Sequence, residues 1–377
     1  MASTLQSFLS RPADAVRRTG PMDHIVFSSR VRLARNIQGY SFPDRAKKAE
    51  RVRCLEAIRG AVEALPVMAE GFSSPMDALN ASDKQLLVER HLISREHAAK
   101  SGGSGLVVDR LESLSVMINE EDHLRMQSLR PGLQLREAWQ AVDEVDSVLE
   151  SKLPFAFSQD LGYLTACPTN VGTGIRVSAM LHLPGLVLAE LVNPIIQSVN
   201  KLGLAVRGLY GEGTEALGNI FQVSNQRTLG ESEIEIVERL SKVVNQMIEH
   251  ERNARQKLLE ERQKVLLNHI GRAFGILANS HSISSKEAMN LLSLVRLAHD
   301  LSMFPAVPRA LLDELFLITQ PAHLQRSHTG KLGADERDIL RADMLREQLR
   351  EVPRPVTPRL TPPAQGASGN PRGTGET

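Results

Sequence analysis

Residues 115–123 have the sequence SVMINEEDH, in which a short apolar and β-branched run leads straight into a group of acidic residues. The run Ser115–Ile118 has the composition of a β-strand. Leu204–Arg207 and Ile220–Val223 are similar runs followed by polar, Gly-containing segments. Because helical segments and loops of unequal length separate these strands, the sequence predicts an α+β sheet domain rather than a regular βαβ arrangement.

The pattern changes after Gly230. Ser232–Glu235 has the Ser-x-x-Glu form of a capping box, and apolar residues at helical spacing follow it. The charged continuation to Lys264 predicts one long helix that leads out of the sheet domain. A second capping box, Ser284–Glu287, begins another helix. The region from about residue 255 is therefore predicted to be all-helical.

These patterns divide the chain into four predicted segments. Residues 1–23 form a short leader, residues 24–254 the sheet domain and residues 255–350 the helical domain. Residues 351–377 are rich in Pro, Gly and Thr and lack apolar periodicity. Such a composition predicts a disordered tail.

Composition excludes several classes of protein. The formal net charge of the 377 residues is +1, so no overall field favours nucleic acid or a membrane surface. The two cysteines, Cys54 and Cys167, are far apart and match no metal-ligand spacing, which is typical of a protein in a reducing cytoplasm. No stretch approaches the roughly 18 apolar residues of a membrane span, and no apolar run near the N-terminus resembles a signal peptide.

The acidic cluster has three possible interpretations. Glu120, Glu121 and Asp122 follow a predicted strand and precede His123. Such carboxylates can bind a cation or act as a base, but a single acidic triplet is more often a set of solvated loop charges. Local sequence leaves these interpretations open.

Five arginines lie at predicted strand or loop boundaries: Arg30, Arg32, Arg125, Arg176 and Arg207. The first two are two residues apart, so in an extended segment both side chains point to one face. Guanidinium groups match phosphate oxygens in a bidentate manner, and converging arginines could hold a triphosphate. The chain has neither a P-loop nor a dinucleotide glycine motif. For each arginine alone, a surface ion pair is an equally good interpretation.

Cys167 lies at the end of an apolar run and is followed by Pro168. Most lone cysteines are inert core residues. Nearby arginines, however, would favour its thiolate form.

Four motifs together resemble the phosphagen kinase family, the ATP:guanido phosphotransferases. They are SSRVR at 28–32, NEEDH at 119–123, CPTNVGTGIR at 167–176 and RGLYGE at 207–212. The resemblance covers about residues 24–254, with the motifs in the family's order and spacing. It implies an α+β catalytic domain with an antiparallel sheet, and ATP and Mg²⁺ as cosubstrate and cofactor.

The resemblance also implies roles for individual residues. Glu121 and Glu212 would grip and deprotonate the guanidino group, Cys167 would lie beside it, and Glu120 would be catalytic and lie near the metal. The nucleotide-binding positions carried over from the family are Ser28, Ser29, Arg30, Val31, Arg32, His91, Arg125, Arg176, Val177, Ser178, Ala179, Met180, Arg207, Gly208, Leu209, Tyr210 and Gly211.

The layout is most similar to the bacterial protein-arginine kinases of this family. Small-molecule members carry a helical domain before the first motif, whereas here a short leader precedes Ser28 and a helical domain follows the catalytic one. Residues 337–342, RDILRA, fit the phosphoarginine-pocket motif of that branch, which would involve Arg337, Asp338, Arg341 and Ala342. On a helix Arg337 and Arg341 share a face, and from spacing alone an ordinary ion pair would explain them.

The resemblance implies partners that the residues themselves do not specify. They are protein substrates with exposed arginines, an activator protein and an AAA+ unfoldase of the Clp type that degrades marked proteins. It also implies inactivation of a stress-response repressor and allosteric control, and the apolar helical domain is compatible with a homodimer. Two alternatives stay open: a kinase of small guanidino compounds, and a non-catalytic adaptor that binds phosphoarginine.

Overall fold

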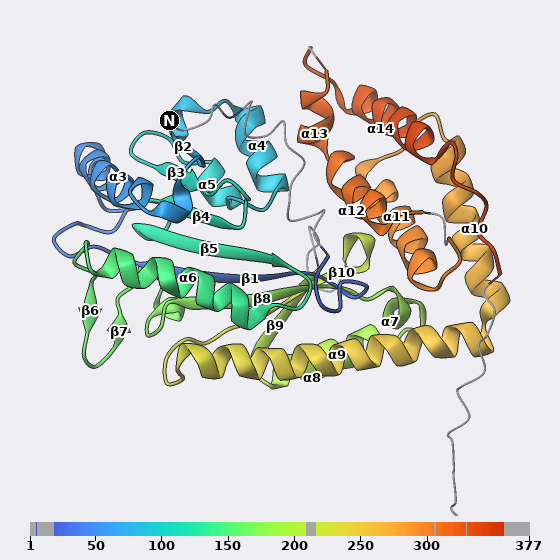
Figure 1. Cartoon of the computed structure of the whole chain (residues 1–377), viewed down its shortest axis with the longest axis horizontal. Helices are drawn as coiled ribbons and strands as arrows, with labels where there is room; N and C mark the ends of the chain where they lie inside the picture. Colours follow the sequence, from blue (N-terminus) through green and yellow to red (C-terminus); the bar gives the residue numbers. More distant parts are fainter. Residues whose placement is uncertain (1–4, 6–18, 209–215, 305–306, 329, 358–377) are drawn as a thin grey trace, which may run out of the picture.

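The computed structural model describes residue 5 and residues 19–208, 216–304, 307–328 and 330–357. Most of the predicted leader and the tail beyond residue 357 lie outside this range. A sheet domain with helices is followed by an all-helical region, which stands to the right of the sheet in Figure 1. The predicted α+β architecture, an antiparallel sheet followed by helices, is confirmed.

Eight strands of the described residues form one sheet, in the order β2-β3-β4-β5-β1-β8-β10-β9. Every neighbouring pair is antiparallel. The strands are β1 (Val26–Arg35), β2 (Phe72–Pro75), β3 (Gly105–Val108), β4 (Leu114–Ile118), β5 (Leu124–Pro131), β8 (Ile175–His182), β9 (Leu204–Gly208) and β10 (Ile220–Asn225). A separate hairpin joins β6 (Phe157–Ser158) to β7 (Gly162–Tyr163). The three strand runs predicted from the sequence correspond to β4, β9 and β10.

The helices of the sheet domain are α3 (Lys48–Glu63), α4 (Ala81–Glu89), α5 (Arg95–Ala98), α6 (Leu135–Glu150), α7 (Pro184–Leu188), α8 (Val192–Lys201) and α9 (Glu233–Glu261). Short 3-10 turns lie at Pro66–Met68, Met76–Ala78, Pro168–Asn170 and Leu217–Asn219. Helix α6 packs against β1 and β5, and α9 packs against β8 and β10. These helices therefore cover one face of the sheet, and the opposite face is free of both α6 and α9.

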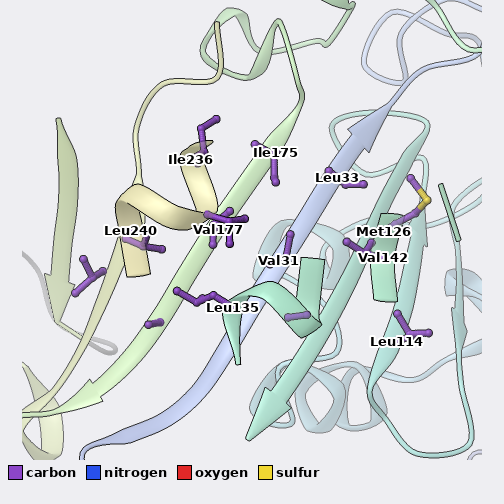
Figure 2. Close-up of a cluster of buried hydrophobic side chains, with 14 of the residues drawn as sticks. Val31, Leu33, Leu114, Met126, Leu135, Val142, Ile175, Val177, Ile236 and Leu240 are labelled. Carbon is purple, nitrogen blue, oxygen red and sulfur yellow. The ribbon is translucent and has the colours of Figure 1, made fainter. Parts of the chain in front are cut away.

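The main core lies between that face and the helices (Figure 2). Val31 and Leu33 of β1 are fully buried there, as are Val142 of α6 and Leu240 of α9. Burying one such side chain contributes about 1.5–3 kcal/mol. This packing stabilises the central strands on the helix side.

Helix α9 begins as the sequence predicts but ends earlier. The Ser232 side chain accepts a hydrogen bond from the Glu235 N–H, and Glu235 bonds back to Ser232, which completes the capping box. The prediction of one helix through Lys264 is wrong. Arg262 has φ −131° and ψ 29°, which is not helical, and it separates α9 from α10. The helix direction changes there, as Figure 1 shows.

The helical region contains α10 (Gln263–Asn279), α11 (Ser285–Asp300), α12 (Arg309–Ile318), α13 (Pro321–Arg326) and α14 (Ala334–Leu349). Ser284 caps α11 by accepting a hydrogen bond from the Glu287 N–H at 3.2 Å. A second core joins these helices. Val352, beyond the predicted end of the helical domain, packs against this core, and the Val356 N–H bonds to the Met303 carbonyl at 3.0 Å.

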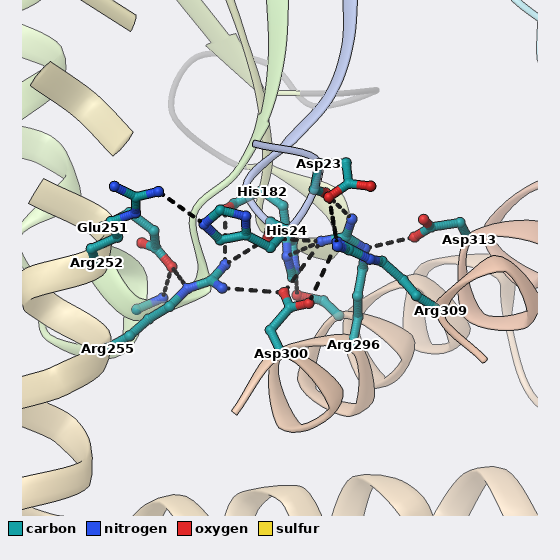
Figure 3. A network of polar contacts seen from close by, with 12 residues as sticks. Asp23, His24, His182, Glu251, Arg252, Arg255, Arg296, Asp300, Arg309 and Asp313 are labelled. Carbon is teal, nitrogen blue, oxygen red and sulfur yellow. Dashed lines mark hydrogen bonds and ion pairs between the residues drawn. The ribbon is translucent and has the colours of Figure 1, made fainter. Parts of the chain in front are cut away.

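A buried polar network joins the two parts of the molecule (Figure 3). Arg296 of α11 is fully buried and donates to Asp313 Oδ1 at 2.6 Å and to the Asp23 carbonyl at 2.7 Å. It also donates to Nδ1 of His182 at 3.1 Å, so the other ring nitrogen of His182 carries the proton and bonds to Ser293. Because Asp23 precedes β1 and His182 ends β8, this network fixes the two central strands relative to α11.

A second link lies between α4 and α13. Glu89, at the end of α4, is buried and accepts hydrogen bonds from the Ala322 N–H at 2.9 Å and from His323 Nδ1 at 2.8 Å. The helical region therefore contacts the sheet domain through α13 as well as through the Arg296 network. Among the described residues, no helix combines the length and apolar character needed to cross a bilayer.

Candidate functional site

Strand alternation gives β1 two sets of side chains. Val31 and Leu33 face the helices, and Arg30 and Arg32 therefore point to the opposite face. Across the ladders, Arg32 lies opposite Arg176 of β8, and Ala34 lies opposite Arg125 of β5. Antiparallel register thus gathers arginines from three strands on the face without the α6 and α9 helices.

A cavity of about 220 Å³ lies on this face. It is lined by Arg32, Ala34, Glu121, Arg125, Cys167, Thr169, Asn170, Gly174, Arg176, Arg207, Gln222 and Ser224. Six of these residues were singled out from the sequence as catalytic or nucleotide-binding. Segments that are far apart in the sequence therefore meet around one space.

The arginines repel one another in the absence of an anion. Burial, followed by the charges of Arg125 and Arg176, lowers the pKa of Arg30 to about 10. Burial and the same neighbours, together with Arg30, lower the pKa of Arg32 well below its usual value. The Nε atom of Arg32 is buried and has no hydrogen-bond partner among the described residues. Such a cluster is suited to a multiply charged anion such as a polyphosphate.

The acidic loop is held by Arg125. Its Nη1 lies 2.7 Å from Glu120 Oε2, and its Nη2 lies 2.8 Å from Glu121 Oε2. The Glu121 side chain is 42% exposed and lines the cavity, whereas the Glu120 side chain is 1% exposed and also accepts a hydrogen bond from Ser94. Glu121 is therefore accessible to a substrate, and Glu120 is placed to hold Arg125.

Cys167 lies directly before the short turn Pro168–Asn170, at the cavity wall. Its Sγ is 3.0 Å from Thr169 Oγ1. Burial and the charges of Arg207 and Arg125 lower the pKa of Arg176, while Cys167 and Glu121 act in the opposite direction. The thiol, the carboxylate and the arginines are thus close enough to influence one another.

Several predicted nucleotide positions do not present their side chains to this space. Ser29, Val31, Val177 and Ala179 are buried on the helix side of β1 and β8. Ser29 Oγ donates to the Gly132 carbonyl at 2.8 Å and accepts from the Gln134 N–H at 2.9 Å, so it fixes the start of α6. Ser28, Ser178 and Met180 share the face of Arg30 and Arg32.

His91 follows α4 with a left-handed φ of 60°. Burial and the charge of Arg30 lower the pKa of His91 to about 4, so the ring is neutral near pH 7 and lies close to the arginine cluster. Its carbonyl accepts a hydrogen bond from Gln127, on the same face of the sheet as Arg32. Gly208 is the last residue of β9. The predicted positions Leu209, Tyr210, Gly211 and Glu212 lie outside the described residues.

Two polar residues of β10 that line the cavity were not predicted from the sequence. Gln222 Oε1 accepts a hydrogen bond from Arg30 at 2.7 Å, and Ser224 lies two positions further along β10. Both alternate with the buried Phe221 and Val223. This period-two pattern in residues 220–225 was the signal available for them.

The described residues contain no group of three His, Cys, Asp or Glu side chains placed to hold a metal ion. Glu120, the predicted metal-side carboxylate, does not line the cavity and is paired with Arg125. This donor set fits Mg²⁺ only in its usual nucleotide-bound form, in which phosphates and waters supply most ligands.

The RDILRA motif lies on α14. Arg341 is 1% exposed, and it donates to the carbonyls of Thr319 and Ile283, each at 2.8 Å, and pairs with Asp338. Arg337 is partly exposed and donates to the Leu332 carbonyl at 2.8 Å. Ala342 is buried. Arg341 thus has a structural role, whereas Arg337 and Asp338 remain accessible.

Two family models match the chain. The model of the ATP:guanido phosphotransferase C-terminal catalytic domain matches residues 54–254, and that of the protein-arginine kinase McsB C-terminal domain matches residues 263–359. The first match ends within α9, and the second begins at the first residue of α10.

Curated relatives match along nearly the whole chain. A protein-arginine kinase from Moorella thermoacetica is 46% identical over 90% of this chain and 98% of that protein. One from Geobacillus sp. is 48% identical over 88% of this chain and 92% of that protein. Among solved structures, lombricine kinase is similar with a TM-score of 0.54 and 25% identity over 67% of this chain and 71% of that one. The duplicated taurocyamine kinase from Schistosoma mansoni, with transition-state analogue components, has a TM-score of 0.56 and 28% identity over 67% of this chain and 36% of that one.

Proposed function

This chain belongs to the ATP:guanido phosphotransferase family, in the branch of the protein-arginine kinases, and we propose that its arginine-lined cavity is where the γ-phosphoryl group of ATP passes to arginine side chains of proteins. The observation that carries this proposal is the meeting of Glu121, Cys167 and four arginines around one cavity. The groups that we assign to the phosphates and those that we assign to the guanidine all line that space.

The arginines are assigned to binding of the nucleotide. Arg32, Arg125, Arg176 and Arg207 would bind the phosphates and stabilise the charge that develops on the transferred group. Arg30, held by Gln222, adds to the positive field from beside the cavity. Mg²⁺ would arrive bound to the phosphates and neutralise part of their charge. Positioning is the main requirement, since phosphoryl transfer needs little covalent help from a protein.

Glu121 and Cys167 are assigned to binding of the incoming guanidine. An arginine guanidinium has a pKa above about 12 and is a poor nucleophile until it loses a proton. Glu121 is assigned to grip the guanidinium and accept that proton, and Cys167 to orient the group. Glu212 is proposed as the second carboxylate on the basis of its motif. The step forms a bond between a guanidino nitrogen and the γ-phosphorus, breaks the γ-phosphorus bond to the β,γ-bridging oxygen, and releases ADP.

The helical region supports a protein rather than a small-molecule substrate. Relatives of 46–48% identity that share both regions of the chain carry the name protein-arginine kinase. We propose that Arg337 and Asp338 of α14 bind phosphoarginine, with Arg341 holding their helix in place. Modification would replace a cation with an anion and so disrupt arginine contacts to DNA or carboxylates.

The finer biological role is proposed from the same resemblance. Marked proteins would be degraded by a Clp-type unfoldase and protease, and a stress-response repressor would be inactivated. An activator protein, a homodimer and a cytoplasmic location complete this proposal.

The decisive experiment incubates the full chain with Mg²⁺, γ-labelled ATP and protamine, an arginine-rich protein. The expected product is labelled protamine whose phosphate is lost in acid and maps to arginine by mass spectrometry. Rapid ADP release with free arginine or creatine, and no labelled protamine, would support the small-molecule alternative. Phosphoarginine binding without any transfer would support the adaptor alternative.

A further inference from the structure

A single buried carboxylate joins the acidic loop to the segment that carries Cys167. Asp122 is fully buried and is not among the residues that line the cavity. Its Oδ1 accepts two hydrogen bonds, from the Ala166 N–H at 2.7 Å and from Asn36 Nδ2 at 2.7 Å. Asp122 is next to Glu121 in the sequence, and Ala166 is next to Cys167. One side chain therefore connects the neighbours of the two groups assigned to the guanidine.

The partners of Asp122 are themselves fixed. Asn36, just after β1, also donates to the Leu164 carbonyl at 3.0 Å and accepts from the His123 N–H at 2.9 Å. His123 Nδ1 accepts from the Ile37 N–H at 3.0 Å. The acidic loop and the Cys167 segment are thus both tied to the end of the strand that carries Arg30 and Arg32.

We propose that Asp122 is a positioning residue for phosphoryl transfer: through its bonds to Ala166 and Asn36 it sets the spacing between Glu121 and Cys167 across the cavity. This inference rests on the proposed function of that cavity. Asp122 touches neither substrate, and its effect is exerted entirely through the two loops.

The geometry explains why a small displacement of the Cys167 segment would slow phosphoryl transfer. A near-attack arrangement requires the guanidino nitrogen about 3–3.5 Å from phosphorus, and a displacement of about 1 Å can reduce the rate about 100-fold. Without Asp122, the Ala166 N–H and Asn36 amide lose a buried acceptor and the Cys167 segment loses its bond to the acidic loop. The phosphate-binding arginines stand on strands whose ladder hydrogen bonds do not involve the Asp122 side chain, so we expect their arrangement to change less than the spacing between Glu121 and Cys167.

At position 122, the placement of one acceptor oxygen should matter for catalysis, and the negative charge should not. Both hydrogen bonds go to Oδ1, and Oδ2 has no partner among the described residues. An asparagine can present one oxygen in the same place. Asp122→Asn should therefore preserve the spacing, whereas Asp122→Ala should lose it.

A matched control is available in the same domain. Asp109 is also buried, and its carboxylate accepts from the Leu114 N–H at 2.7 Å and from Ser113 Oγ at 2.8 Å, in the turn between β3 and β4. It is absent from the residues lining the cavity. Asp109→Ala removes a comparable buried carboxylate without touching the loops of the proposed site.

The test is steady-state kinetics of the full chain with Mg²⁺-ATP and protamine. In Asp122→Ala we expect kcat to fall about 100-fold while the KM for ATP stays within about threefold. Asp122→Asn should recover kcat to within about tenfold of wild type, because it keeps the acceptor. Asp109→Ala should leave kcat near the wild-type value. If Asp122→Ala does not fold, Asp122→Ser, which is too short to reach Ala166, carries the same expectations.

Two kinetic outcomes would overturn the proposal. Equal losses in Asp122→Asn and Asp122→Ala would mean that the charge is required. Equal losses in Asp122→Ala and Asp109→Ala, with similar losses of thermal stability, would mean that Asp122 only supports the fold.

Thiol chemistry gives a readout that does not depend on kinase activity. The other cysteine, Cys54, is buried, and burial raises its pKa to about 12, so iodoacetamide reports on Cys167. Asp122→Ala should change the alkylation rate of Cys167 by severalfold, and Asp122→Asn should restore it. An unchanged rate in Asp122→Ala would overturn the inference even if the wild type phosphorylates protamine. Failure of the wild type to phosphorylate protamine would instead refute the proposed function.

Discussion

Arg125 and Glu121 form an ion pair within the cavity, with 2.8 Å between Nη2 and Oε2, although the two residues are assigned to different substrates. Nucleotide phosphates would attract Arg125, and an arriving guanidinium would attract Glu121. Binding of each substrate should therefore weaken this pair and ease binding of the other. The pair links the two halves of the site.

Replacing Glu121 should separate catalysis from nucleotide binding. Glu121→Gln removes the proposed base and frees Arg125, so kcat should fall at least about 100-fold, and ATP should bind as tightly as in wild type or more tightly. Steady-state kinetics and ATP titration by calorimetry measure the two effects. Glu56→Gln, on the exposed side of α3, serves as the control. Wild-type kcat in Glu121→Gln would refute the assignment of the base.

The arginine cluster should reduce the stability of the nucleotide-free protein. Burial and neighbouring arginines lower the pKa of Arg32, which means that its charged form is disfavoured in the folded state. Arg32→Met should relieve this repulsion and raise Tm by about 2–4 °C for each kcal/mol gained. The same variant should lose most of the Tm increase that ATP gives to the wild type. Thermal denaturation with and without ATP checks both, and a full ATP-induced increase in the variant would contradict the nucleotide role.

The contribution of His97 to stability should decrease as pH falls from 6.5 towards 4. Burial lowers the pKa of His97 to about 4, while the charge of Glu120 opposes this shift. Between pH 6.5 and 4, His97 is therefore protonated in the unfolded chain but neutral in the folded chain. The stability contributed by neutral His97 is therefore present above the unfolded pKa and is lost at lower pH.

His97→Gln keeps a donor for the Gly105 carbonyl, to which His97 bonds at 2.9 Å, but cannot take up that proton. It should reduce the slope of unfolding free energy by up to about 1.4 kcal/mol per pH unit in this range. Urea denaturation at several pH values measures the slope. His281→Gln, at an exposed histidine of the helical region, is the control. An unchanged slope in His97→Gln would assign the pH dependence to other groups.

The domain junction should depend on Arg296. Arg296→Met leaves Asp313 without its buried partner and the Asp23 carbonyl without its donor. Breaking such a buried pair from one side costs about 3–5 kcal/mol. Thermal unfolding should begin at lower temperature and lose cooperativity as the helical region separates from the sheet. Arg272→Met, on the exposed side of α10, should unfold like the wild type.

The sequence predicted local features well because local rules govern them. Alternation in β1 placed Arg30 and Arg32 on one face, and the pattern Ser232–Glu235 marked the start of α9. The break at Arg262 was missed because no Gly or Pro interrupts the helical pattern there. The meeting of Glu121 with Cys167 was expected from resemblance alone, since strand register and loop contacts are not encoded in neighbouring residues.

Two arginines of α14 should respond differently to substitution, although their spacing makes them look equivalent. Arg341→Ala would leave the buried carbonyls of Thr319 and Ile283 without donors, at a cost of about 1–3 kcal/mol each. Arg337→Ala removes a partly exposed side chain with one carbonyl contact, so stability should change by less than about 0.5 kcal/mol. The Arg341 variant tests the fold of the helical region, and the Arg337 variant tests the binding of phosphoarginine.

Calorimetric titration with free phosphoarginine separates these roles. Arg337→Ala should bind at least about tenfold more weakly than the wild type, because a charge-assisted bond to the phosphoryl group is lost, while Tm is unchanged. Lys286→Ala, in the first turn of α11, controls for a general loss of positive charge. If Arg337→Ala binds phosphoarginine like the wild type, the proposed pocket does not lie on α14. The RDILRA motif would then have only the structural role that Arg341 already performs.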